Sequence, residues 1–170
     1  MLHYIPMFAN LFGNKTPVHL RDIHLYNTES KKLEVFKPLN DKEVKMYSCG
    51  PTVYDFAHIG NLRSYVFADI AKRVLIRNGF PVKHTINLTD FGHLTSDGDE
   101  GEDKMMKGLN REGLDINLDS MRKLSDRYIK AFEEDLYEMR IIPPAIFARA
   151  SDYIKKQISL IKTLDEKGFT

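Results

Sequence analysis

Residues 44–88 read VKMYSCGPTVYDFAHIGNLRSYVFADIAKRVLIRNGFPVKHTINL, and this stretch decides the fold. Val44–Ser48 alternates apolar and polar residues as a strand does, and Gly50-Pro51 ends it. Residues 82–88 alternate in the same way and predict a second strand. With a helix between them, the two strands form a parallel pair joined by a right-handed crossover, so the fold class is α/β.

The helix inside this unit is indicated by apolar residues spaced four apart. Leu62, Val66, Ile70 and Val74 carry this period. They predict an amphipathic helix that begins near Gly60-Asn61 and stops at Asn78-Gly79, where glycine readily takes the left-handed conformation of a helix end.

Other elements flank this unit on both sides. We expect an irregular leader over residues 1–21, and then a hairpin in which residues 24–26 pair with residues 32–36 across a turn. The acidic, glycine-rich run from Ser96 to Asp103 predicts a solvated loop, because an EF-hand would need a carboxylate where Gly101 stands. Two further amphipathic helices are predicted, from about Leu118 to Arg140 and from about Ser151 to Gly168, separated by Pro143-Pro144.

Composition excludes several classes of protein. The 170 residues are 42% apolar, and 25 basic against 24 acidic side chains give a net charge of +1, which favours neither disorder nor general DNA binding. A single cysteine excludes an intramolecular disulfide and a zinc site built from several cysteines of this chain. No stretch has the length and apolarity of a membrane span or a secretory signal. We therefore expect a soluble, cytoplasmic protein without a membrane partner.

The segment from Tyr47 to Asn61 is the best candidate for chemistry, because it lies between the first strand and the helix. Ligands of open α/β sheets bind beyond the carboxyl ends of the strands, and a helix N-terminus suits phosphate. His58 and Asn61 share a face there, and Gly60 allows close approach to the backbone. The alternative is structural: a surface histidine at 58 and an N-cap at 61.

Single residues in this sequence leave several possibilities open. Cys49 is compatible with a buried small hydrophobe, a thiol nucleophile or one ligand of a metal. His84 alternates with apolar neighbours and predicts a hydrogen-bonded sheet histidine, and His93 predicts a loop residue. Tyr65, together with two aromatic residues of the predicted helix 118–140, is expected to lie in the core.

Three motifs in order resemble the cysteinyl-tRNA synthetase family of class I aminoacyl-tRNA synthetases. They are Cys-Gly-Pro-Thr-Val-Tyr-Asp at residues 49–55, His-Ile-Gly-Asn at 58–61 and Asn-Leu-Thr-Asp at 87–90. The resemblance covers about residues 22–170. It implies the N-terminal part of a Rossmann-type catalytic core that is incomplete at its C-terminus, with the start of a helical insertion after the second core strand.

The resemblance also implies roles for individual residues. His58 and Asn61 would be catalytic and, with Gly60, would bind ATP. Gly50, Thr52 and Thr89 would bind the substrate cysteine. Cys49 would be a ligand of the Zn²⁺ that selects cysteine, since a soft metal discriminates a thiolate from a serine hydroxyl.

Two departures from the family pattern affect these expectations. The fourth signature residue is Asn61 where the family has histidine, so it can donate a hydrogen bond but cannot carry a charge. The other zinc ligands, the family's lysine loop and the anticodon-binding helices are expected beyond Thr170, and Lys104-Met-Met-Lys107-Gly108 is interpreted as ordinary helix or loop sequence. We expect these 170 residues alone to be inactive.

The implied activity is a cysteine–tRNA ligase of protein biosynthesis. It uses ATP with Mg²⁺, L-cysteine and tRNA(Cys). One alternative is a cysteine ligase of small-thiol biosynthesis that shares the zinc and ATP motifs. Another is a non-catalytic fragment derived from a synthetase.

Overall fold

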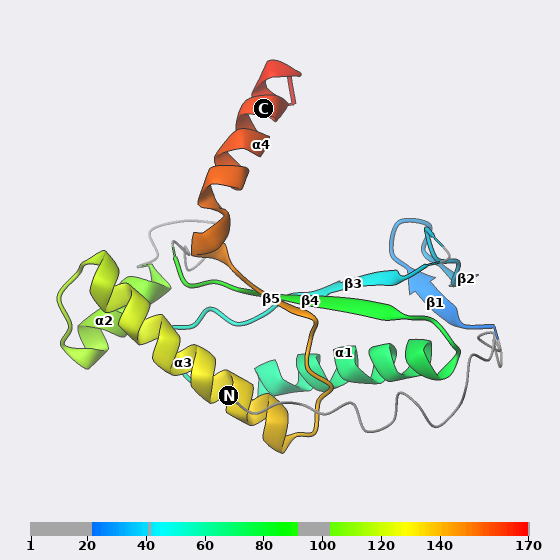
Figure 1. The fold of residues 1–170 in the computed structure, drawn as a ribbon, viewed down its shortest axis with the longest axis horizontal. Coiled ribbons are helices and arrows are strands. Elements are labelled where there is room, and N and C mark those ends of the chain that lie inside the picture. Colours follow the sequence, from blue (N-terminus) through cyan, green and yellow to red (C-terminus); the bar gives the residue numbers. More distant parts are fainter. Residues whose placement is uncertain (1–21, 41, 92–102, 170) are drawn as a thin grey trace.

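The computed structural model describes residues 22–40, 42–91 and 103–169. Its centre is a three-stranded parallel sheet, formed by β3 (Val44–Ser48), β4 (Val82–Leu88) and β5 (Ile146–Arg149) in the order β3-β4-β5. Helix α1 (Ile59–Arg77) connects β3 to β4 and runs along one face of the sheet (Figure 1). The strand–helix–strand unit predicted from the sequence is confirmed, with Val44 beside Val82 and Ser48 beside Ile86.

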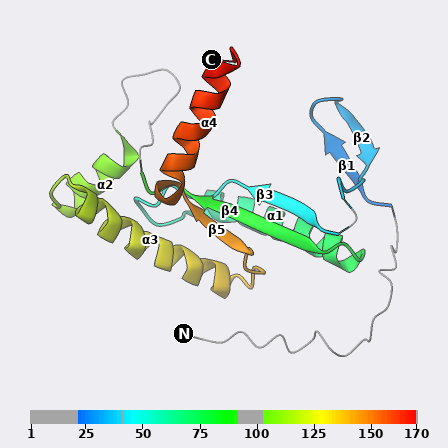
Figure 2. The same ribbon diagram turned by 45° about the horizontal axis from the view of Figure 1, so that its top comes forward.

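The predicted hairpin and the first of the two further predicted helices are present. β1 (His24–Asn27) pairs antiparallel with β2 (Lys32–Val35) as the expected hairpin, set apart from the main sheet (Figure 2). α3 (Leu118–Glu138) buries the predicted face through Leu124, Tyr128, Phe132 and Leu136. It ends two residues before the predicted Arg140, because Met139 caps it and Arg140 takes a positive φ of 55°.

The structure adds elements that periodicity did not predict. β5 is too short for its four residues to show a period, and it forms because β4 offers a free edge. Residues 104–112 form α2 (Lys104–Glu112), which resolves the helix-or-loop interpretation as a helix with Asp103 as its N-cap. The last predicted helix starts as a 3₁₀ turn (Ala150–Tyr153) and continues as α4 (Ile154–Glu166), which projects away from the sheet (Figures 1 and 2).

The predicted apolar stripe of α1 is not its buried face. Ile70 is 55% exposed, and Val66 and Val74 are also exposed. The helix instead buries Tyr65, Ala68, Asp69, Lys72 and Leu75. Burying two charged residues is possible because partners meet them: Asp69 accepts the Ile142 N–H at 2.9 Å, and Lys72 donates to the Pro143 carbonyl at 2.7 Å.

One hydrophobic core joins α1, α2 and α3 to β4 and the segment after β3. Its buried members are Val53, Tyr65, Leu88, Met105, Leu109, Leu124, Tyr128, Phe132, Leu136 and Ile141. The three aromatic residues predicted as core, Tyr65, Tyr128 and Phe132, are confirmed, and Tyr65 meets Phe132 edge to face with ring centroids 4.8 Å apart. His93 and residues 1–21, together with the acidic run up to Glu102, lie outside the described residues. Among the described helices, none has the length and apolarity needed to cross a membrane.

Candidate functional site

The candidate site is built at the carboxyl edge of the sheet, where β3 and β4 end side by side. Just beyond both strands, Thr52 and Thr89 form an isolated parallel bridge. Its hydrogen bonds run from the Val53 N–H to the Thr89 carbonyl and from the Thr89 N–H to the Pro51 carbonyl, each at 3.0 Å. The structure therefore brings together two of the three residues predicted to bind substrate.

The third, Gly50, lies against β4 and has no room for a side chain. A Cβ atom added there would lie 1.7 Å from the Asn87 carbonyl oxygen and 2.7 Å from Ile86 Cγ2. The Gly50 N–H donates to Asn87 Oδ1 at 2.8 Å. Glycine at this position thus allows the chain leaving β3 to touch the backbone of β4.

His58 and Asn61 form a reciprocal cap at the start of α1. His58 Nδ1 accepts the N–H groups of Gly60, at 3.1 Å, and of Asn61, at 3.4 Å, while Asn61 Oδ1 accepts the His58 N–H at 3.1 Å. The structural alternative placed the N-cap at residue 61, and this is wrong: His58 is the N-cap and Asn61 is the third residue of the helix. A Cβ on Gly60 would lie 2.9 Å from His58 Cε1, so glycine lets the imidazole fold over the backbone.

This cap fixes which donors of the two side chains point outward. Because Nδ1 of His58 accepts hydrogen bonds, the proton of the neutral imidazole is on Nε2. Because Oδ1 of Asn61 is occupied, its NH₂ group is the part left to donate. Both side chains are exposed. The start of α1 therefore offers two side-chain donors together with the positive end of the helix dipole, an arrangement that suits a phosphate group.

Cys49 is exposed, so the interpretation as a buried small hydrophobe is wrong. Its Sγ lies 3.7 Å from the Gly50 carbonyl oxygen, a weak contact. Burial raises the pKa of Tyr65 to about 12, and the charge of a Cys49 thiolate raises it further.

The described residues do not complete a zinc site. Within them, no group of three or more His, Cys, Asp or Glu side chains is placed to hold a metal ion. A catalytic zinc usually has three protein ligands. Cys49 offers one accessible sulfur donor.

Asn87 and Asp90 are functional candidates that the sequence analysis quoted within a motif but did not assign. Asn87 contacts Gly50 and also donates from Nδ2 to Thr89 Oγ1 at 3.2 Å. Asp90 is buried and accepts from Arg149 Nε at 3.1 Å and from the Ser151 N–H at 2.9 Å, which ties the end of β4 to the end of β5. Their position on either side of Thr89, at the end of a predicted strand, could have identified them as site residues from the sequence.

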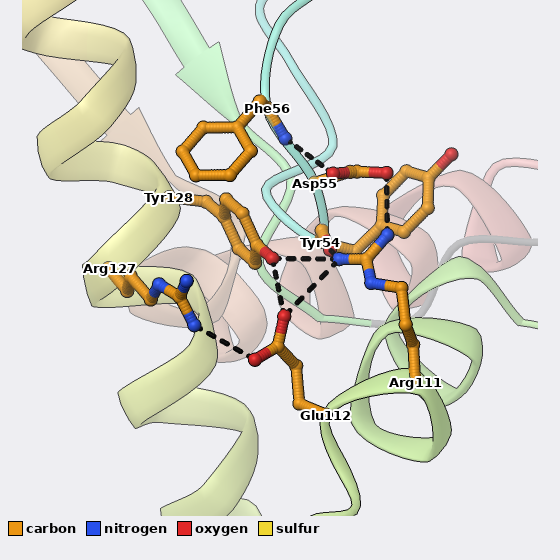
Figure 3. A network of polar contacts seen from close by, with 7 residues as sticks. All are labelled: Tyr54, Asp55, Phe56, Arg111, Glu112, Arg127 and Tyr128. Carbon is orange, nitrogen blue, oxygen red and sulfur yellow. Dashed lines mark hydrogen bonds and ion pairs between the residues drawn. The ribbon is translucent and has the colours of Figure 1, made fainter.

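A polar network from α2 and α3 contacts the loop between β3 and α1 (Figure 3). The Arg111 guanidinium of α2 donates to the Asp55 carboxylate at 2.5 Å, and to the Tyr54 carbonyl and the Tyr128 hydroxyl at 2.7 Å each. Tyr128 in turn donates to Glu112 at 2.8 Å, and this hydrogen bond lowers the pKa of the Glu112 carboxyl. The network anchors the loop that leads into His58 to two helices outside the sheet.

His84 is only partly hydrogen-bonded. Its Nε2 lies 2.8 Å from Ser48 Oγ, whereas Nδ1 is buried and has no partner among the described residues. The prediction of a hydrogen-bonded sheet histidine is therefore confirmed for Nε2 and not for Nδ1. Burial lowers the pKa of His84, and the neighbouring Lys72 ammonium lowers it further.

The described surface is hollowed on the sheet and at the end of α3. A groove of about 310 Å³ lies on the sheet face opposite α1 and is lined by Lys45, Met46, Tyr47, Lys83, Thr85 and Ile146. A larger one, about 1040 Å³, lies at the end of α3 and is bordered by residues such as Arg73, Tyr137 and Pro143, none of which the sequence analysis predicted as a site residue.

The chain matches a known family of catalytic domains. The family model described as the class I tRNA synthetase (C) catalytic domain matches residues 35–170, and the chain belongs to that family. The Rossmann-type α/β class expected from the sequence is thus confirmed.

Similar curated proteins are named as cysteine–tRNA ligases. The chain is 51% identical over 145 residues to cysteine–tRNA ligase 1 of Burkholderia lata, covering 85% of this chain and 30% of the relative. It is 45% identical over 145 residues to the cysteine–tRNA ligase of Zymomonas mobilis, with 85% and 27% covered. It is 43% identical over 148 residues to that of Treponema denticola, with 87% and 29% covered. The chain thus spans less than a third of the length of these relatives.

Proposed function

We propose that the full-length protein activates L-cysteine with ATP and transfers it to tRNA(Cys). The observation that carries the proposal is the His58–Asn61 cap, which directs an Nε2–H and an NH₂ group outward at the carboxyl edge of the sheet, the edge at which Cys49 follows β3 and Thr52 bridges to Thr89. Cysteine–tRNA ligases at 43–51% identity over most of the chain support the same activity.

In the activation step, the carboxylate of cysteine attacks the α-phosphate of Mg²⁺-bound ATP, and pyrophosphate leaves. This reaction needs no protein nucleophile, so the protein acts by positioning and by stabilising charge. His58 and Asn61 donate hydrogen bonds to phosphate oxygens whose negative charge grows in the transition state. Gly60 leaves room for the His58 imidazole to fold over the helix start, and this keeps the ring in the orientation that presents its Nε2–H to the nucleotide.

The amino acid occupies the neighbouring part of the site. Gly50, Thr52 and Thr89 border it where β3 and β4 end, and the accessible thiol of Cys49 lies at the same edge. We assign Cys49 as one ligand of a cysteine-selecting zinc ion, with the other ligands contributed from outside the described residues.

The proposal is tested with the full-length protein in two assays. Cysteine-dependent exchange of pyrophosphate into ATP tests activation, and charging of tRNA(Cys) tests transfer. We expect both activities. Exchange with ligation to an aminosugar instead of tRNA would establish the thiol-biosynthesis alternative, which these relatives do not favour. The absence of exchange in folded protein would establish a non-catalytic role.

A further inference from the structure

The side chain of Asn87 joins three parts of the candidate site. Its Oδ1 accepts the Tyr47 hydroxyl at 2.9 Å and the Gly50 N–H at 2.8 Å, and its Nδ2 donates to Thr89 Oγ1 at 3.2 Å. One amide group thus contacts the end of β3, the chain leaving β3, and the residue after β4.

The orientation of this amide follows from hydrogen-bond chemistry. A backbone N–H can only donate, so the side-chain atom facing the Gly50 N–H must be the oxygen. The NH₂ group therefore faces Thr89. Since an NH₂ group only donates, the Thr89 hydroxyl must accept from it and cannot direct its own hydrogen toward Asn87.

The Thr89 hydroxyl therefore accepts a hydrogen bond on the side of Asn87 and can donate one only in another direction. No other hydrogen bond of Thr89 Oγ1 occurs among the described residues, so its O–H remains available to donate. We propose that Asn87 is a positioning residue that holds the Thr89 hydroxyl as a hydrogen-bond donor toward an anionic atom of the bound cysteine. This inference rests on the proposed function, because that function places Thr89 at the amino acid.

The substitution Asn87→Asp reverses this polarity with little change of shape. The introduced carboxylate still accepts from Tyr47 and Gly50, but it now presents an acceptor to Thr89, and the hydroxyl turns to donate to it. In the full-length enzyme we expect kcat/KM for cysteine to fall about tenfold to a hundredfold, chiefly through the KM for cysteine, because a substrate acceptor loses its donor. The KM for ATP should change much less.

A double-mutant cycle separates the hydroxyl from the added charge. In a Thr89→Val background there is no hydroxyl to reorient. There Asn87→Asp should lower kcat/KM for cysteine only through its added charge, several-fold less than it does in the parent. Tyr47→Phe is the matched control, because it removes one donor to Asn87 Oδ1 and leaves the contacts to Gly50 and Thr89 in place; it should cost less than about threefold. Equal losses from Asn87→Asp in both backgrounds would overturn the proposal.

A readout independent of activity tests the hydrogen bond itself. By NMR, exchange of the Asn87 side-chain NH₂ protons should be faster in Thr89→Val than in the parent, while Thr89→Ser should retain the parent rate. An identical rate in all three proteins would overturn the assigned polarity. If the parent fails to activate cysteine, the proposed function is wrong, whereas this measurement still decides how Asn87 orients Thr89.

Discussion

Gly50 and Asn87 lie against each other although they are 37 positions apart in the chain, and the Gly50 N–H donates to Asn87 Oδ1 at 2.8 Å. The 1.7 Å that would separate a Gly50 Cβ from the Asn87 carbonyl oxygen is far shorter than any atomic contact allows. Every residue proposed to bind the amino acid lies within a few positions of this contact. The spacing of β3 and β4 at their carboxyl ends therefore sets the geometry of the candidate site.

Gly50→Ala should destabilise the protein by about 3 kcal/mol or more, because the backbone of β4 must move to admit the methyl group. Thermal or urea unfolding measures this loss. Gly113→Ala is the control: there an added Cβ meets open space and only the positive φ of 65° is strained, at a cost of roughly 1–2 kcal/mol. Equal losses in the two variants would contradict the steric account.

Cys49→Ser in the full-length protein should lose zinc and cysteine-dependent pyrophosphate exchange. In metal-free protein its stability should change by less than about 0.5 kcal/mol, because the thiol is exposed. Metal analysis, the exchange assay and unfolding measure these three properties. A variant with stoichiometric zinc and the parent's exchange rate would remove Cys49 from the site.

His58→Asn should separate capping from catalysis. Asparagine is a good N-cap, so helix stability should be retained, but the outward Nε2–H is lost. If that donor acts like one in an oxyanion hole, adenylate formation should slow by the equivalent of about 2.7–4 kcal/mol. His58→Ala should show the same slowing plus a stability loss of about 1 kcal/mol.

Asn61→Ala should likewise slow adenylate formation more than it weakens ATP binding, since its NH₂ group is proposed to act in the transition state. Single-turnover kinetics and equilibrium ATP binding measure the two effects separately. A variant in which only the ATP affinity changes would argue that Asn61 binds the ground state alone.

Arg111→Lys should loosen the loop before α1, because a single ammonium group cannot reach Tyr54, Asp55 and Tyr128 together. We expect a loss of about 1–3 kcal/mol in the free energy of unfolding. Lys123→Ala breaks an ion pair that is 75% exposed at both partners and should cost less than about 1 kcal/mol. A smaller loss in Arg111→Lys than in Lys123→Ala would show that the network does not stabilise the fold.

His84 should make stability depend on pH. Its pKa is lowered in the folded protein, so between that value and about 6.5 the unfolded chain binds more protons than the folded one. The free energy of unfolding should therefore fall as pH drops through about 6.5. Urea unfolding at several pH values should show a weaker fall in His84→Gln, whereas His24→Gln, at an exposed position, should leave it unchanged.

The sequence was sufficient to predict elements whose signal is local. The alternation at residues 44–48 and 82–88 and a helix that begins near Gly60-Asn61 depend on neighbours a few positions apart. The structure confirms both strands and begins the helix one residue earlier, at Ile59. β5 was missed because four residues carry no usable period. The buried face of α1 was predicted wrongly because Asp69 and Lys72 are buried only through partners 70 or more residues away.

The candidate site divides in the same way. The sequence by itself determined the strand–helix–strand unit and the residue types at its carboxyl edge, since motif and periodicity are properties of contiguous residues. Only the tertiary structure decided that Asn87 orients Thr89 against Gly50, that Asp90 holds Arg149, and that Arg111 anchors the loop before His58. The reason is physical: Asn87 meets Gly50, Asp90 meets Arg149 and Arg111 meets Tyr54 across 37, 59 and 57 positions, and such polar pairs form only where the packed core brings distant segments together.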